Sequence, residues 1–139
     1  MSIAQLSVFV ENKAGHLAET LATLAEGKVN VLFFTIADTT DYGILRLVVD
    51  NVVRAQELLR AGGYAVVEHE VVCAVLPDQP GVLAAVARLV SDSGLDIEYI
   101  YLGTGNSLLL KTEELERLEA LLIANGFRVL SPGDLKQPA

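Results

Sequence analysis

The segment NKAGHLA, Asn12–Ala18, returns 66 positions later as DQPGVLA, Asp78–Ala84. The same offset places Val29–Val31 on Leu95–Ile97, so the match runs for about 25 residues without a gap. Polar, glycine and apolar residues recur in the same order, which chance explains poorly. The chain therefore contains two similar halves in tandem.

Each half repeats one order of strand and helix patterns. Leu6, Val8 and Val10 alternate with polar residues, which indicates a strand, and Leu17 and Leu21 begin a series with helical spacing. The first half predicts strands at 5–11, 31–36, 44–49 and 64–67 and helices at 17–26 and 53–61. The second half predicts strands at 72–76, 97–102, 108–111 and 127–130 and helices at 82–90 and 113–124.

The order β-α-β-β-α-β predicts an α+β fold made of two ferredoxin-like units, each an antiparallel sheet with helices on one face. We expect a first domain at 1–70, a second domain at 71–131 and a frayed C-terminal tail at 132–139. No Pro-, Gly- or Ser-rich linker separates the halves, so we expect them to be docked side by side.

Composition narrows the class of protein. The chain has 139 residues, 52% of them hydrophobic, and a net charge of −8. This acidic balance argues against nucleic acid and against a membrane surface as partners. The sequence Met1–Gln5 lacks a basic, apolar leader, and the single cysteine, Cys73, allows no disulfide framework within the chain. We expect a soluble cytoplasmic domain, with Cys73 buried in a strand.

One face of the predicted sheets carries apolar side chains. If Arg46 and Glu98 point away from the helices, alternation turns four apolar residues the same way: Ile44, Val48, Ile100 and Leu102. A large exposed apolar face usually marks a contact, so we expect a homodimer or larger assembly through it. The alternative is scattered apolar surface residues without a partner.

The turns that join strand to helix are the candidate ligand sites. Gly15 and Gly81 allow a close backbone approach, and the helix that follows offers free N–H groups that suit a carboxylate. Asn12 and Asp78, three residues before these glycines, are positioned to orient a ligand. The alternative is that Asn and Asp are ordinary turn residues.

The turn motif, together with Gly-x-(Asn or Asp)-(Ile or Val) at the following strand, resembles the ACT domain. DQPGVL with SGLDI (Ser93–Ile97) is a close match, whereas NKAGHL with GKVNV (Gly27–Val31) has Ala14 in place of the usual proline. The resemblance covers nearly the whole chain as two copies. It implies a regulatory module that binds a small molecule, most often an amino acid, at interfaces between copies.

In the serine-binding ACT domain of phosphoglycerate dehydrogenase, two asparagines contact the ligand, and their equivalents here resemble Asn12 and Asn30. In that type of ACT domain, a histidine stands two positions before the first asparagine. This chain has Val10 at that position, which departs from the pattern. The candidate ligand-binding residues are Asn12, Lys13, Ala14, Gly15, His16, Leu17 and Asn30 in the first half, and Asp78, Gln79, Pro80, Gly81, Val82, Leu83 and Asp96 in the second.

The two turns differ in charge. The first half has neutral Asn12 and Asn30 with Lys13 and His16 nearby, whereas Asp78 and Asp96 hold the matching positions in the second. A ligand carboxylate about 4 Å from a carboxylate costs about 1 kcal/mol in water. We therefore expect the first turn to be the better carboxylate site and the change Asn12→Asp to weaken binding. Asp78 is suited instead to a ligand ammonium.

The sequence offers little support for catalysis. Two histidines and one cysteine do not combine into a recognisable nucleophilic or metal site, and we expect neither an enzyme nor a cofactor. An amino-acid-binding module that signals to a separate protein is the favoured function. The alternative is a protein–protein interaction module whose turns are structural and which binds no small ligand.

Overall fold

The computed structural model describes residues 2–11, 15–38 and 42–135, which fall into two compact units. One unit is Ala4–His69, called the first unit below, and the other is Met1–Ile3 with Glu70–Ala139, called the second unit. The boundary lies inside the strand β4, Ala65–Val75, so the chain passes from one unit to the other within a strand.

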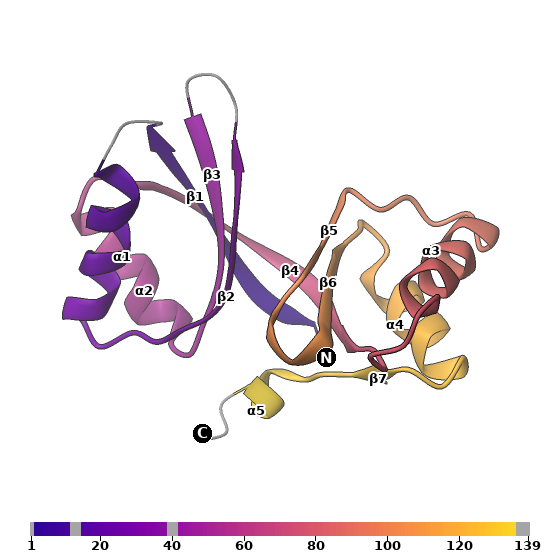
Figure 1. Ribbon diagram of the computed structural model, residues 1–139. Coiled ribbons are helices and arrows are strands. Elements are labelled where there is room, and N and C mark those ends of the chain that lie inside the picture. The colour runs from indigo at the N-terminus through magenta and orange to yellow at the C-terminus, as the bar shows by residue number, and fades with distance from the viewer. Residues whose placement is uncertain (1, 12–14, 39–41, 136–139) are drawn as a thin grey trace. The chain divides into compact units, whose positions relative to one another are not determined.

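The first unit has the element order expected from the sequence (Figure 1). It contains β1 (Ile3–Glu11), α1 (His16–Glu26), β2 (Val31–Asp38), β3 (Tyr42–Val49), α2 (Val52–Ala61) and the beginning of β4. The strands lie in the order β2-β3-β1-β4, with β3 antiparallel to both β1 and β2. This is the ferredoxin-like arrangement, and the two helices cover one face of the sheet.

The second unit repeats the arrangement. After β4 come α3 (Val82–Asp92), β5 (Tyr99–Leu102), a 3-10 turn (Thr104–Asn106), β6 (Ser107–Lys111), α4 (Leu115–Ala124), β7 (Arg128–Val129) and α5 (Pro132–Leu135). Both β6 and β7 pair antiparallel with β4, and β5 pairs antiparallel with β6. The prediction of an α+β fold with antiparallel strands is confirmed. Within the described residues, no helix has the length and apolar character needed to cross a membrane.

Each unit has its own core between sheet and helices. In the first unit Leu6 and Val8 on β1 and Leu45 and Leu47 on β3 are fully buried and pack beneath α1 and α2. The second unit buries the corresponding positions: Val72, Ala74, Leu76, Val86, Val90, Leu95, Leu108, Leu110, Leu118 and Leu122. The alternation and the helical spacing in the sequence arise because these side chains face one core in each unit.

The expected direction of four apolar side chains is right for β3 and wrong for β5. Ile44 and Val48 share a face with Arg46 by alternation along β3, away from the helix-covered core. Ile100 and Leu102, in contrast, lie opposite Leu110 and Leu108, which belong to the core beneath the helices. They therefore lie on the helix side of their sheet.

A bend in the chain explains why Ile100 and Leu102 lie on the helix side of the sheet. Glu98 lies in a bend before β5 begins at Tyr99, so alternation counted from Glu98 does not continue into the strand. The first unit has a similar irregularity, because the register of β2 against β3 shifts between Val31 and Phe33. A bulge of this kind reverses the face of every residue that follows it.

The C-terminal segment is more ordered than the expected frayed tail, in the part that the structure describes. Residues 132–135 form the short helix α5. The backbone N–H and the hydroxyl of Ser131 donate hydrogen bonds to the Asp134 carboxylate at 2.7 and 2.9 Å and lower its pKa. An ion pair between Arg128 and Asp134 at 3.8 Å adds to the contacts of this segment.

Cys73 on β4 is fully buried, as expected, and gives the fold a dependence on alkaline pH. Burial raises the pKa of its thiol from 9.0 to about 11, although a side-chain hydrogen bond with Ser107 opposes the rise. Between pH 9 and 11 the unfolded chain ionises this thiol more readily than the folded chain, so stability falls as the pH rises.

We expect the loss to reach about 2–3 kcal/mol in the free energy of unfolding by pH 11. Urea unfolding of the wild type and of Cys73→Ala at pH 8, 9, 10 and 11 measures it. Across this pH window, the free energy of unfolding of the wild type should fall relative to that of the variant. A constant gap would show that the buried thiol contributes no pH dependence.

Candidate functional site

The turn between β4 and α3 is the better described of the two candidate sites. Gly81 stands at the N-terminus of α3 with φ 88°, a left-handed conformation that an L side chain rarely adopts. The Gln79 N–H donates to the Pro77 carbonyl oxygen at 3.0 Å, and this bond tightens the turn. A ligand can therefore approach the backbone at the first turn of α3 without meeting a side chain at Gly81.

The N-terminus of α3 carries no side-chain cap. The first intrahelical bond runs from the Ala85 N–H to the Gly81 carbonyl oxygen at 2.9 Å, and the Val82 N–H donates to the Gln79 carbonyl oxygen at 3.4 Å. The Leu83 and Ala84 N–H groups of the first turn are therefore the ones that lack an intrahelical acceptor. Such groups, together with the positive end of the helix dipole, attract an anion. The end of α3 is therefore suited to a carboxylate.

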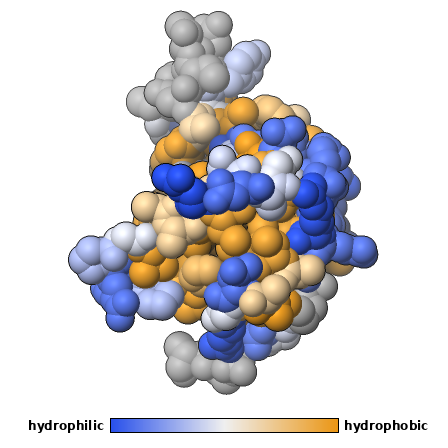
Figure 2. Space-filling view, turned by 90° about the vertical axis from the view of Figure 1, so that its right-hand side faces the viewer, coloured by the Kyte–Doolittle hydropathy of each residue, from blue (hydrophilic) through white to orange (hydrophobic). Residues whose placement is uncertain are grey.

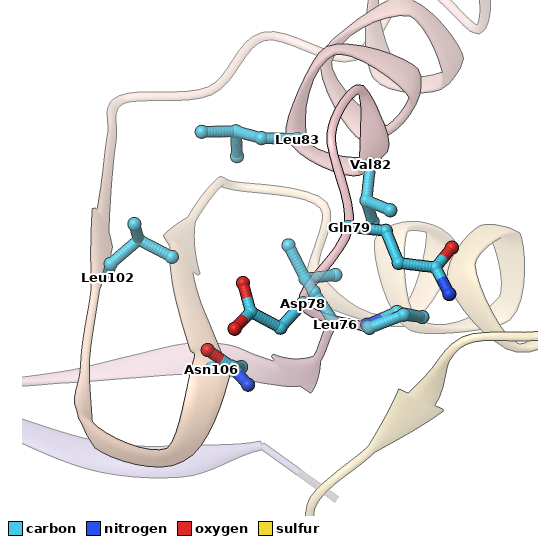
Figure 3. Close-up of a pocket in the computed structure, with 8 residues that line it drawn as sticks. Leu76, Asp78, Gln79, Val82, Leu83, Leu102 and Asn106 are labelled. Atoms are coloured by element: carbon cyan, nitrogen blue, oxygen red, sulfur yellow. The ribbon is translucent and has the colours of Figure 1, made fainter.

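A small open pocket of about 140 Å³ lies against this turn (Figure 3). Its eight lining residues are Leu76, Pro77, Asp78, Gln79, Val82, Leu83, Leu102 and Asn106. The Asp78 carboxylate and the Asn106 amide lie next to each other in this view, whereas the Gln79 amide points away from them. Leu83 and Leu102 form an apolar wall that comes from α3 and from the end of β5.

Only one side chain gives this pocket a charge. Asp78 is exposed and is the only charged residue of the eight that line the pocket. Its carboxylate attracts a cation, while the end of α3 attracts an anion. An α-amino acid carries both an ammonium and a carboxylate on one carbon, so it matches this pair of attractions.

The first turn is described only in part. Asn12, Lys13 and Ala14 of the candidate site lie outside the described residues. Gly15 has φ 89°, and the Glu19 N–H donates to the Gly15 carbonyl oxygen at 2.9 Å, so the geometry repeats that of Gly81. His16 and Leu17 are half-buried at the start of α1. From Gly15 onward the two turns have the same backbone.

Asn30 and Asp96, the other candidate residues, lie far from the turns of their own units. Asp96 follows α3, and its carbonyl oxygen accepts a hydrogen bond from the Thr112 hydroxyl at 2.8 Å. Asn30 follows α1 and bonds to Asp50, with its N–H 2.9 Å from the Asp50 carboxylate. An 11-residue helix is about 16 Å long, so α3 separates Asp96 from Asp78 by roughly that distance.

The structure therefore brings together the turn residues Asp78, Gln79, Val82 and Leu83 in one pocket, but it does not bring Asp96 to them. Four lining residues were not among the candidates: Leu76, Pro77, Leu102 and Asn106. Asn106 has φ 59° in the turn before β6. This turn is shorter than its counterpart in the first half, so the repeat gave no signal for Asn106.

The described residues contain no group of three or more His, Cys, Asp or Glu side chains placed to hold a metal ion. Lys111, on β6, is engaged in an ion pair with Glu98 at 2.8 Å, which raises the pKa of the lysine. Lys111 and Glu98 are thus partners of each other and lie outside the turn pocket.

Comparison with known proteins identifies the family. Residues 1–137 match the family model described as an ACT domain pair. The chain belongs to the ACT domain pair family. Domains of the ACT kind typically bind small ligands and are usually regulatory. No curated protein matches this chain in sequence.

Solved structures agree with the assignment to ACT domain pairs. Protein BT0572 from Bacteroides thetaiotaomicron is 32% identical, with 99% of this chain and 98% of that chain covered and a TM-score of 0.90. The ligand-free regulatory subunit of aspartate kinase from Thermus thermophilus is 20% identical over 87% of this chain and 90% of that chain, with a TM-score of 0.65. The corresponding subunit from Thermus flavus is 20% identical over 88% and 92%, with a TM-score of 0.64. At 20% identity the likeness is one of fold.

Proposed function

We propose that this ACT domain pair is a non-catalytic regulatory module that binds a free amino acid at its strand-to-helix turns. The observation that carries the proposal is the pocket in which the Asp78 carboxylate lies beside the uncapped N-terminus of α3. The fold likeness to regulatory subunits of aspartate kinase adds support. The output of binding passes to a regulated protein.

In the pose that we propose, the ligand ammonium binds Asp78 and the Asn106 side chain. The ligand carboxylate accepts hydrogen bonds from the first N–H groups of α3, and the ligand side chain lies against Leu83 and Leu102. A charge-assisted hydrogen bond to an ammonium and a helix end facing a carboxylate are both favourable at a partly open surface. The two contacts select α-amino acids over simple carboxylates or amines.

The pocket is smaller than most small-molecule sites, which enclose about 300–1,000 Å³. At about 140 Å³, one turn supplies only part of a complete site. We propose that the rest of the wall comes from another ACT copy, so that the ligand lies near an interface between ACT domains. Asn30 and Asp96, which lie at the far ends of their helices, are the candidates to complete such a site.

The two turns are proposed to act differently. The first turn, with Asn12 and Lys13 in place of Asp78 and Gln79, is the better site for a ligand recognised chiefly by its carboxylate. The second turn requires the ligand ammonium to neutralise Asp78. Asn12→Asp should weaken binding at the first turn, and equal affinity in that variant would remove this distinction.

Thermal unfolding of the protein with each of the twenty amino acids tests the proposal. A ligand at about 100 times its dissociation constant adds roughly 2.7 kcal/mol of stability. For a chain of this size the unfolding midpoint should rise by about 5–10 °C with one or a few amino acids. If none of the twenty raises the midpoint at millimolar concentration, the alternative of an interaction module without a small ligand replaces this proposal.

A further inference from the structure

The wall of the turn pocket in the second unit is mostly apolar. Five of its eight lining side chains are apolar: Leu76, Pro77, Val82, Leu83 and Leu102. Leu83 on α3 and Leu102 at the end of β5 are 46% and 58% exposed. Hydrophobic residues are exposed on the α3 and α4 side of this unit, among hydrophilic ones (Figure 2). Covering the two leucines with an apolar group is favourable, because it removes their side chains from water.

The polar groups of the pocket serve the parts that all α-amino acids share. In the proposed pose, Asp78 and Asn106 bind the ligand ammonium, and the free N–H groups in the first turn of α3 face the carboxylate. The Gln79 amide points away from Asp78 and Asn106 (Figure 3). The Asn106 carbonyl oxygen accepts a hydrogen bond from the Leu76 N–H at 2.9 Å, which ties the turn before β6 to the end of β4. The apolar wall therefore remains for the side chain of the ligand.

A charged ligand side chain is disfavoured in this pocket. Asp78 is the one charged residue among the eight that line it, and in the proposed pose it is engaged by the ligand ammonium. A second carboxylate on the ligand would be repelled by Asp78. A second ammonium or a guanidinium would lose water against the leucines without a further carboxylate to bind. The charge of the pocket thus opposes both acidic and basic amino acids.

The size of the pocket limits the ligand side chain as well. A space of about 140 Å³ has to hold the ammonium, the α-carbon and the side chain. Leu102 faces Leu83 across this space, from β5 to α3 (Figure 3). An aromatic ring would meet the Leu102 side chain, and packed atoms tolerate little overlap. A short aliphatic side chain, such as that of valine or leucine, requires less room and covers both leucines.

We propose that the turn pocket of the second unit selects amino acids with an uncharged aliphatic side chain, and that Leu102 determines how large this side chain can be. The inference rests on the proposed function, which places an amino acid at this turn, and adds the class of that amino acid. Asp78 and the backbone of α3 recognise groups that every α-amino acid carries. Discrimination between amino acids therefore depends on the apolar wall.

The first half carries different side chains at the same places. The offset of 66 puts His16 at the position of Val82 and Asn12 at the position of Asp78. An imidazole in place of an isopropyl group offers a ligand side chain a hydrogen bond and not an apolar contact. The aliphatic preference is therefore expected at the second turn, and its test has to report on that turn separately.

Amide-resolved NMR titrations with leucine and with aspartate test the side-chain class. The two ligands have side chains of similar shape, and shifts of the Leu83 and Asn106 amides report binding at this turn. Leucine should bind at least tenfold more tightly than aspartate, because it covers the apolar wall and brings no second negative charge. Equal affinities or tighter binding of aspartate would overturn this inference and leave the proposed amino-acid site intact. If none of the twenty amino acids shifts these amides, the amino-acid site itself is removed, and the inference with it.

Leu102→Ala tests the role of Leu102, with Ile100→Ala as the matched control. Both are exposed aliphatic residues on the helix side of β5, but Ile100 does not line the turn pocket. The ratio of the affinity for phenylalanine to that for valine should rise by about tenfold in Leu102→Ala, the scale of small size changes in an apolar pocket. It should stay within twofold in Ile100→Ala. An unchanged ratio in Leu102→Ala, or the same rise in both variants, would overturn the role given to Leu102.

Discussion

The change Asp78→Asn is expected to weaken amino-acid binding at the second turn by about 10- to 150-fold. The reason is the loss of a hydrogen bond between a carboxylate and the ligand ammonium, worth about 1.5–3 kcal/mol. Asn has nearly the same shape as Asp and remains compatible with a turn, and Asp78 is exposed, so the fold is preserved. Isothermal titration with the amino acid that most raises the unfolding midpoint measures the change.

Asp92→Asn is the matched control for this experiment. Asp92 is also exposed and carries the same charge, but it lies at the C-terminal end of α3 and does not line the turn pocket. Its replacement should leave the affinity within about twofold, since long-range charge effects at an exposed site are screened by salt. Equal losses in the two variants would mean that the net charge of the chain, and not a contact at Asp78, governs binding.

The change Leu122→Ala is expected to lower the stability of the second unit by about 2–5 kcal/mol. Leu122 on α4 is fully buried in the core beneath the helices. Its truncation removes apolar contacts and leaves a cavity that the packed neighbours fill only in part. Urea unfolding should show the loss, and the thermal midpoint should fall by about 8–20 °C.

The neighbouring residue provides the control. Ile123 follows Leu122 on α4 but is 49% exposed, so Ile123→Ala should cost less than about 1 kcal/mol. The contrast between two adjacent residues tests which face of α4 lies against the core, which the spacing of leucines predicts for this segment. Similar losses in both variants would mean that α4 presents a different face to the core.

The sequence predicts the fold well because its two copies obey the same constraints. Alternation in β1 and helical spacing in α1 each reflect a core on one side, and the second copy repeats both patterns. The two strands predicted at 64–67 and 72–76, however, form the single strand β4. The direction of Ile100 and Leu102 could not be predicted in this way. The bend at Glu98 changes the parity of the strand, and nothing in the local residue types signals such a bend.

The candidate site is predicted in part for a similar physical reason. A turn of four to six residues is local, so Asp78 and the neighbours of Gly81 appear together in sequence and in the pocket. Asn106 and Leu102 reach the same pocket through the pairing of β5 with β6, which a one-dimensional pattern does not encode. Asp96 matches the family motif, yet the length of α3 keeps it away from the turn of its own unit.

An amide-resolved NMR titration tests the central claim most directly. The ¹⁵N–¹H spectrum of the protein is followed while an amino acid that raises the unfolding midpoint is added to saturation. The largest shifts should occur at Asp78–Ala84, where the carboxylate meets the first N–H groups of α3, and at Asn106. Unchanged amides at these positions, with shifts confined to other segments such as α4, would contradict an amino-acid site at this turn.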